Sequence, residues 1–94
     1  MLVMCKYSFH AGPNAAKSLA RFIQWTPPDG FVMKDLWMAS GHSGFFLGET
    51  DGVAPLMELT AQYADLAFFE IHPVVLAEEG VPVLQRGFEY AAAH

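Results

Sequence analysis

Residues 31–50, FVMKDLWMASGHSGFFLGET, decide how the rest of the chain must fold, because they hold two apolar runs separated by one short turn. The runs Phe31–Ser40 and Phe45–Thr50 are rich in aromatic and aliphatic side chains, which is typical of β-strands. Between them lies Gly41-His42-Ser43-Gly44, whose two glycines allow a tight reversal of the chain. The stretch therefore predicts a β-hairpin at the centre of a chain of 94 residues.

A strand and a helix are predicted before the hairpin. Leu2–Phe9 is apolar and aromatic, and polar residues interrupt it at a spacing of two, which indicates a strand. Asn14 is a favourable N-cap for a helix over Ala15–Trp25, and the prolines of Thr26-Pro27-Pro28-Asp29-Gly30 end that helix. We expect its buried stripe to consist of Ala16, Leu19, Ala20 and Ile23, with Lys17, Arg21 and Gln24 on the opposite side.

The same pattern of helix and strand follows the hairpin. A second helix is predicted over Val53–Asp65, capped by Asp51 or Thr50, with a proline in its first turn, where proline is tolerated. Ala67–Leu76 indicates a fourth strand, and Val83–Ala92 a short terminal helix. The expected buried stripe of the second helix consists of Leu56, Leu59, Thr60 and Tyr63.

The predicted order is strand, helix, strand, strand, helix, strand. Right-handed crossovers fold that order into a ferredoxin-like antiparallel sheet of the α+β class, with strand order 4-1-3-2 and both helices on one face. A chain of 94 residues is too short for two cores, so residues 1–94 form one domain, with residues 77–94 as a C-terminal extension. The other face of the sheet is bare, yet both faces are apolar in Val3/Met4, Phe45/Phe46 and Val74/Val75. We therefore predict a two-fold homodimer through the bare face.

Composition agrees with a covered face and excludes several partners. Hydrophobic residues make up 53% of the chain and charged residues 16%, which is more apolar than an average soluble domain. Ten acidic and five basic residues give a net charge of −5 without a basic cluster, which argues against nucleic-acid binding. A single cysteine excludes an internal disulfide, and no apolar run reaches the roughly 18 residues of a membrane span. We expect a soluble, cytoplasmic protein without a membrane partner.

Two segments resemble a known family. Residues 43–51, SGFFLGETD, which follow Trp37, and residues 64–74, ADLAFFEIHPV, are similar to the third and fourth strands of the family called domain of unknown function 3303. The resemblance spans residues 1–76, and the segment after Leu76 has no clear counterpart. It implies membership of the dimeric α/β-barrel superfamily, in which two ferredoxin-like sheets pack face to face. That superfamily includes cofactor-free monooxygenases, polyketide cyclases, lactone isomerases and haem enzymes, so the fold alone names no reaction.

Strand alternation brings together three polar side chains that are candidates for catalysis. Lys6 lies on one face of the first strand, and Glu70 and His72 project together from the fourth. If the two faces coincide, Glu70 would orient His72 as a general base, with Lys6 beside them to bind substrate. The alternative interpretation is an ion pair or hydrogen-bonded pair within the dimer interface, and structural pairs of that kind commonly imitate active sites.

Two more histidines and two aromatic residues are candidates for a pocket. His10 ends the first strand and His42 lies in the hairpin at the same edge of the sheet, so they would flank the mouth of a helix–sheet pocket. Trp37 and Tyr63 are candidates for holding a planar ligand, although aromatic residues also fill cores and histidines at strand ends are commonly only solvated. No metal is expected, because the four histidines lack the spacing of metal ligands. No cofactor is expected either: His72 or His42 could be an axial ligand of haem, but a domain of 94 residues offers little room for it.

These observations predict a homodimer that binds a small hydrophobic or aromatic molecule. If the protein is an enzyme, the expected reaction is isomerisation, cyclisation or cofactor-free monooxygenation with a histidine base. The alternative is a non-enzymatic ligand-binding, stress or regulatory dimer, and the sequence leaves this choice open. Motifs for nucleotide binding, serine hydrolysis and zinc proteolysis are absent.

Overall fold

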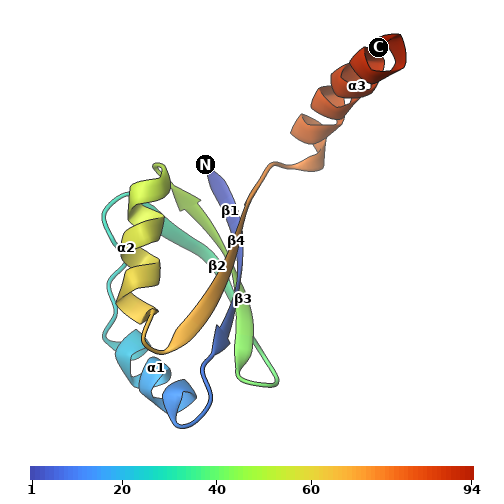
Figure 1. Cartoon of the computed structure of the whole chain (residues 1–94). Coiled ribbons are helices and arrows are strands. Elements are labelled where there is room, and N and C mark those ends of the chain that lie inside the picture. The colour runs from blue at the N-terminus through green and yellow to red at the C-terminus, as the bar shows by residue number, and fades with distance from the viewer.

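The computed structural model describes residues 1–94 and contains the predicted elements in the predicted order (Figure 1). The four strands form one antiparallel sheet in the order β2-β3-β1-β4. The ferredoxin-like βαββαβ fold of the α+β class is therefore confirmed, and a C-terminal helix follows it. The elements are β1 (Leu2–Phe9), α1 (Asn14–Ile23), β2 (Phe31–Ala39), β3 (Ser43–Thr50), α2 (Val53–Tyr63), β4 (Ala67–Val74) and α3 (Ala77–Ala93).

The central strand, β1, fixes the register of the sheet. Its Cys5 is paired with Phe46 of β3, and its Lys6 with Glu70 of β4. Because successive residues point to opposite faces, Cys5 and Phe46 lie on the face that α1 and α2 cover, whereas Lys6 and Glu70 lie on the other. We call this second side the open face; its residues include Met4, Lys6, Trp37, Phe45, Phe68, Glu70 and His72.

A β-bulge in β2 determines which of its residues join the open face. Met33 is paired with Gly48 and Asp35 with Leu47, so Lys34 is an extra residue between the two pairs. An extra residue reverses the alternation beyond it. Trp37 therefore lies on the open face, although without the bulge it would share the helix-covered face with Met33.

The face that α1 buries differs from the prediction. Ala16, Leu19, Ala20 and Ile23 were the predicted stripe, but Leu19 is 52% and Ile23 74% exposed, and both alanines are exposed as well. Ser18 is buried instead, and Phe22 and Trp25 are half-buried and stacked with their ring centroids 5.7 Å apart. The reason is size: burying two aromatic rings removes more apolar area from water than burying small side chains such as alanine.

The predicted helix caps are also wrong in detail. Asn14 is the first residue of α1, and its side-chain amide donates to the carbonyls of His10 and Ala11 rather than capping the helix. The N-cap of α2 is Gly52, and the Thr50 hydroxyl donates to the Gly52 carbonyl at 2.8 Å. The side chains thus tighten the preceding loops, while the helix starts stay where the sequence placed them to within a residue.

The core is small and lies between the sheet and the two helices. Only 14 of the 94 residues are buried, and the main cluster consists of Val3, Cys5, Phe31, Phe46, Leu56 and Leu59. Gly48 is required beside this cluster, because a Cβ atom there would overlap the Phe31 ring. In α2, Leu56, Leu59 and Tyr63 are buried as predicted, and Thr60 is half-buried.

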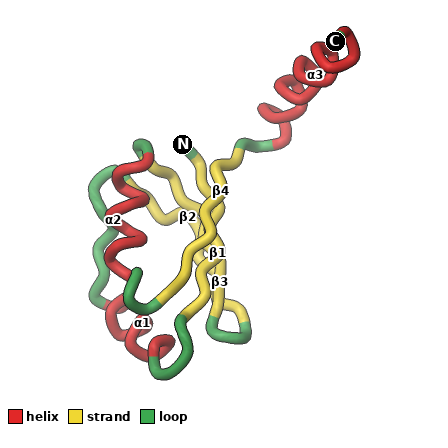
Figure 2. Tube along the Cα trace, in the orientation of Figure 1, coloured by secondary structure: helices red, strands yellow, loops and turns green.

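The terminal helix is longer than predicted. It was expected over Val83–Ala92, but α3 already begins at Ala77 and has Pro82 inside it. Two glutamates in its first turn are favourable at the positive end of the helix dipole. The helix extends away from the rest of the molecule beyond the end of β4 (Figure 2).

Candidate functional site

A cavity of about 400 Å³ lies between the sheet and the helices α1 and α2. Fifteen of the 20 residues that line it are hydrophobic. The β2–β3 hairpin loop, with His42, contributes one side, and the far side is formed by α2 and the start of β4. The principal walls are Tyr7, Leu36, Phe46 and Phe69 from the sheet and Leu19, Phe22, Leu59 and Tyr63 from the helical layer.

The lining of the cavity is polar in places but carries no carboxylate, lysine or arginine. An ionised ligand would have no counter-charge there, and burying an unpaired charge is very unfavourable. The cavity therefore suits an uncharged, mainly apolar molecule. Its hydrogen-bonding side chains are Tyr7, Ser18, Trp25, Ser40, His42, Ser43 and Tyr63.

Tyr63 lines the cavity and carries a fully buried polar group without a partner. Its side chain is only 8% exposed, and its hydroxyl is buried without a hydrogen bond. Burial raises the pKa of the Tyr63 hydroxyl, so the group keeps its proton and remains a hydrogen-bond donor. An unsatisfied buried hydroxyl costs about 1–3 kcal/mol, which a ligand with an acceptor atom would relieve.

The Tyr63 ring is held in place from two sides. Trp25 lies edge-on to it, with ring centroids 6.1 Å apart, and the Arg21 guanidinium lies 5.6 Å from the ring centroid. The Trp25 indole in turn donates to Gln62 Oε1 at 2.7 Å. These contacts fix the ring, so the position of the unpaired hydroxyl is set before any ligand arrives.

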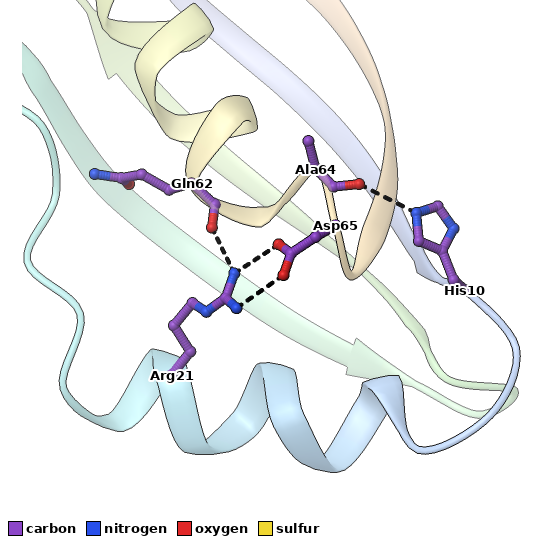
Figure 3. A network of polar contacts seen from close by, with 5 residues as sticks. All are labelled: His10, Arg21, Gln62, Ala64 and Asp65. Carbon is purple, nitrogen blue, oxygen red and sulfur yellow. Dashed lines mark hydrogen bonds and ion pairs between the residues drawn. The ribbon is translucent and has the colours of Figure 1, made fainter.

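Arg21 also ties the two helices together at the edge of the cavity (Figure 3). Its Nη1 donates to Asp65 Oδ1 at 2.8 Å and to the Gln62 carbonyl at 2.7 Å, and its Nη2 donates to Asp65 Oδ2 at 3.0 Å. The hydrogen bonds from Arg21 hold the pKa of the Asp65 carboxyl below its usual range. Both partners are exposed, so the pair orients α1 over the cavity more than it stabilises the fold.

A second tyrosine in the lining is already satisfied. The Tyr7 hydroxyl donates to the Trp37 carbonyl at 3.1 Å. A Cβ atom at Gly44 would overlap both partners of this bond, so the glycine makes room for it. Tyr7 is therefore a wall of the cavity whose hydroxyl is engaged, in contrast to Tyr63.

The structure separates the two pocket histidines of the sequence analysis. His42 lines the cavity in the β2–β3 turn, where its backbone adopts φ of 57°. His10 does not line the cavity: its Nε2 lies 3.2 Å from the Ala64 carbonyl, and its ring lies edge-on to Phe68 with centroids 4.1 Å apart (Figure 3). Of these two candidates, only His42 is placed to meet a ligand inside the cavity.

The candidates Lys6, Glu70, His72 and Trp37 all lie on the open face, on the opposite side of the sheet from the cavity. Lys6 is directly opposite Glu70, and His72 Nε2 is 3.8 Å from Glu70 Oε1. The Glu70 and His72 side chains are 67% and 64% exposed. The structure thus brings these three polar residues together, but at a distance from His42 and Tyr63.

Two other kinds of chemistry find no support in the geometry. Burial raises the pKa of the Cys5 thiol to about 12, so it is not a ready nucleophile. No group of three or more histidine, cysteine, aspartate or glutamate side chains is arranged to hold a metal ion.

Several cavity residues escaped the sequence analysis, namely Tyr7, Ser18, Phe22 and Phe69. Tyr7 and Phe69 are paired across β1 and β4 and lie on the same face as Cys5. Strand alternation could therefore have placed both residues on the face that the helices cover. Ser18 and Phe22 could have been found by testing a second helical stripe in α1 beside the more apolar one.

None of the three helices is both long and apolar enough to cross a membrane. No curated protein and no solved structure matches the chain. The family model described as Domain of unknown function (DUF3303) matches residues 1–88, which carries the likeness beyond Leu76 and corrects the expectation that the terminal segment has no counterpart. The chain therefore belongs to the DUF3303 family.

Proposed function

We propose that this protein is a homodimer that binds an uncharged, mainly apolar molecule in the helix–sheet cavity of each subunit. The observation that carries the proposal is Tyr63, which lines the mainly apolar cavity and has a buried hydroxyl without a hydrogen-bond partner. A filled core does not need this group, whereas a bound molecule would give it a partner.

The walls and the polar groups define the class of ligand. A volume of about 400 Å³ is in the range of small-molecule sites, which hold about 300–1,000 Å³. Phe22, Phe46 and Phe69 offer faces and edges for a planar ring system. Because Tyr63 is a donor, the ligand needs an acceptor such as a carbonyl oxygen, as aromatic ketones, quinones and polyketides have.

The dimer is supported by the surface that a single chain exposes. The accessible surface is 6491 Å², about 1,100 Å² more than a compact protein of 10.3 kDa has. Part of this surplus comes from α3, none of whose residues is buried, and a standard interface buries about 800 Å² per partner. On the open face, Trp37, Phe45 and Phe68 are between 40% and 67% exposed.

In this dimer Lys6, Glu70 and His72 lie within the interface between the two sheets. Glu70 and His72 approach each other at 3.8 Å but do not line the cavity, which favours the structural interpretation of the pair over a catalytic one. Their proposed role is to set the register between the subunits, because paired charges in an interface reject misaligned partners.

Proton-transfer chemistry is a second candidate function, and His42 supports it. It is the one imidazole in the lining of the cavity, and a neutral histidine is a general base near physiological pH. No carboxylate in the cavity orients it, so a binding protein without catalysis fits the lining better.

Prodan, an uncharged naphthalene ketone whose emission depends on polarity, is a suitable probe. We expect the emission of prodan to shift to the blue on binding. Its affinity should be about fivefold lower for Tyr63→Phe than for the wild type, because one hydrogen bond is worth about 1 kcal/mol. The affinity should not change in the control Tyr90→Phe, whose ring is exposed on α3. 2-Dimethylaminonaphthalene, which lacks the ketone, should bind Tyr63→Phe and Tyr90→Phe with the same affinity.

A second variant tests whether prodan enters the cavity at all. Ser18 and Ala67 are buried and line it, so Ser18→Phe combined with Ala67→Leu fills much of its volume. Circular dichroism should show an unchanged fold and the fluorescence should show no binding. Equal binding by this folded variant would place the probe elsewhere and refute the proposal.

A further inference from the structure

The terminal helix α3 makes no buried contact with its own chain. None of its 17 residues is buried, and its large apolar side chains remain between 51% and 68% exposed. The helix stands off the end of β4, away from the rest of the molecule (Figure 1). The radius of gyration is consequently 16.6 Å, whereas a compact chain of this length has about 12 Å.

One face of α3 is nevertheless built like an interface. Five of its apolar residues follow one another at spacings of four and three, which places them in a single stripe along the helix, whereas Val83 and Tyr90 lie off that stripe. Glu79, Arg86 and Glu89 lie on the opposite side of the helix. The stripe consists of Ala77, Val81, Leu84, Phe88 and Ala91.

The composition of α3 requires that this stripe be packed. Pro82 lies inside the helix and costs about 3 kcal/mol in a helix interior, and Gly80 and Gly87 cost about 1 kcal/mol each. Isolated helices of this length are marginal even with favourable residues. The helix is therefore stable only if burial of its apolar stripe offsets these costs.

The position of α3 indicates what covers it. In Figure 1, α1 and α2 lie on one side of the sheet, and α3 leaves β4 toward the other side, where the open face lies. The connecting residues Val75 and Leu76 are themselves apolar and about 60% exposed, so an apolar surface runs from the open face into the stripe. A second copy on the open face would meet this surface without interruption.

We infer that α3 is an arm that packs its apolar stripe against the body of the second subunit. This rests on the dimer in the proposed function. A two-fold axis makes the exchange reciprocal, so each subunit gives one arm and receives one. The arm adds contact area beyond the sheet faces, and burial against the partner offsets the cost of the one proline and two glycines in the helix.

Matched double variants test the arm. Leu84→Glu with Phe88→Glu places two negative charges in the stripe, and Gln85→Glu with Arg86→Gln changes the net charge by the same amount away from it. By sedimentation equilibrium we expect the dimer dissociation constant to rise at least a hundredfold in the stripe variant and to stay within about threefold in the control. An unchanged constant in the stripe variant overturns the arm and leaves the sheet-face dimer intact.

Two further results separate the remaining possibilities. Leu84→Cys introduces a thiol into the stripe, and the natural Cys5 is buried. Rapid disulfide formation between two such variant chains would show that α3 pairs with α3 of another copy, which overturns packing on the partner body. A monomeric wild type overturns the arm together with the dimer, while prodan binding in the same sample decides separately whether the cavity proposal stands.

Discussion

Replacing Tyr63 by phenylalanine removes one oxygen atom from the wall of the cavity and leaves the ring. In most proteins, loss of a buried tyrosine hydroxyl is destabilising because a hydrogen bond is lost. Here the hydroxyl has no partner in the unliganded chain, so there is no bond to lose. Tyr63→Phe should therefore leave the ligand-free protein as stable as before or more stable.

The magnitude follows from the surroundings of the two cavity tyrosines. An unsatisfied buried hydroxyl costs about 1–3 kcal/mol, so its removal should gain about 1 kcal/mol. Tyr7 is the matched control, because its hydroxyl donates to the Trp37 carbonyl at 3.1 Å and Tyr7→Phe should lose about 1 kcal/mol. The two variants are expected to differ by about 2 kcal/mol, or roughly 10 °C in Tm for a domain of this size.

The assay is thermal and urea unfolding of protein freed of ligand by refolding. All samples are compared at one protein concentration, because the stability of a dimer depends on concentration. Added prodan should stabilise the wild type more than Tyr63→Phe. If Tyr63→Phe destabilises the ligand-free protein as much as Tyr7→Phe does, the Tyr63 hydroxyl has a partner after all, and the argument for a ligand acceptor fails.

Three further predictions follow from other parts of the structure. Cys5, with its pKa raised to about 12 by burial, should react with iodoacetamide at pH 8 far more slowly in the native protein than in urea; equal rates would show that the strand is not protected. The hydrogen bonds from Arg21 lower the pKa of the Asp65 carboxyl in the folded protein. The ionised carboxyl therefore stabilises the fold at pH values above its ordinary pKa of 3.8, and this stabilisation is lost as the pH falls through the lowered pKa. Asp65→Asn should therefore flatten the acid side of the Tm–pH curve, and an unchanged curve would mean that the pair contributes nothing. Gly48→Ala should destabilise the fold by about 1–3 kcal/mol through overlap with Phe31, while Gly87→Ala in α3 has free space and serves as the control.

The strands were predictable because they depend on local signals, and their order in the sheet because crossovers are right-handed. Alternating apolar residues mark β1, and the Gly41–Gly44 turn marks the hairpin, so only the ends shift by a residue or two. Strand parity also anticipated that Lys6 would lie beside Glu70, which the register confirms. Where apolar and polar residues alternate with a period of two, the sequence alone predicts the strand and the residues that share each of its faces.

What could not be predicted depends on choices between competing surfaces. In α1 two stripes compete, and the one with Ser18 and Phe22 turns toward the sheet, where both residues line the cavity. The bulge at Lys34 places Trp37 on the open face, and no feature of the local sequence predicts this bulge. The position of Trp37 on the open face follows from the bulge, so it required the three-dimensional structure.

Native mass spectrometry with added prodan can show directly whether a dimer holds one apolar ligand in each helix–sheet cavity. We expect the mass of two chains with up to two prodan molecules, and a dimer without prodan for the variant with Ser18→Phe and Ala67→Leu. A single chain as the only species, or equal prodan loading of the wild type and this variant, would contradict it.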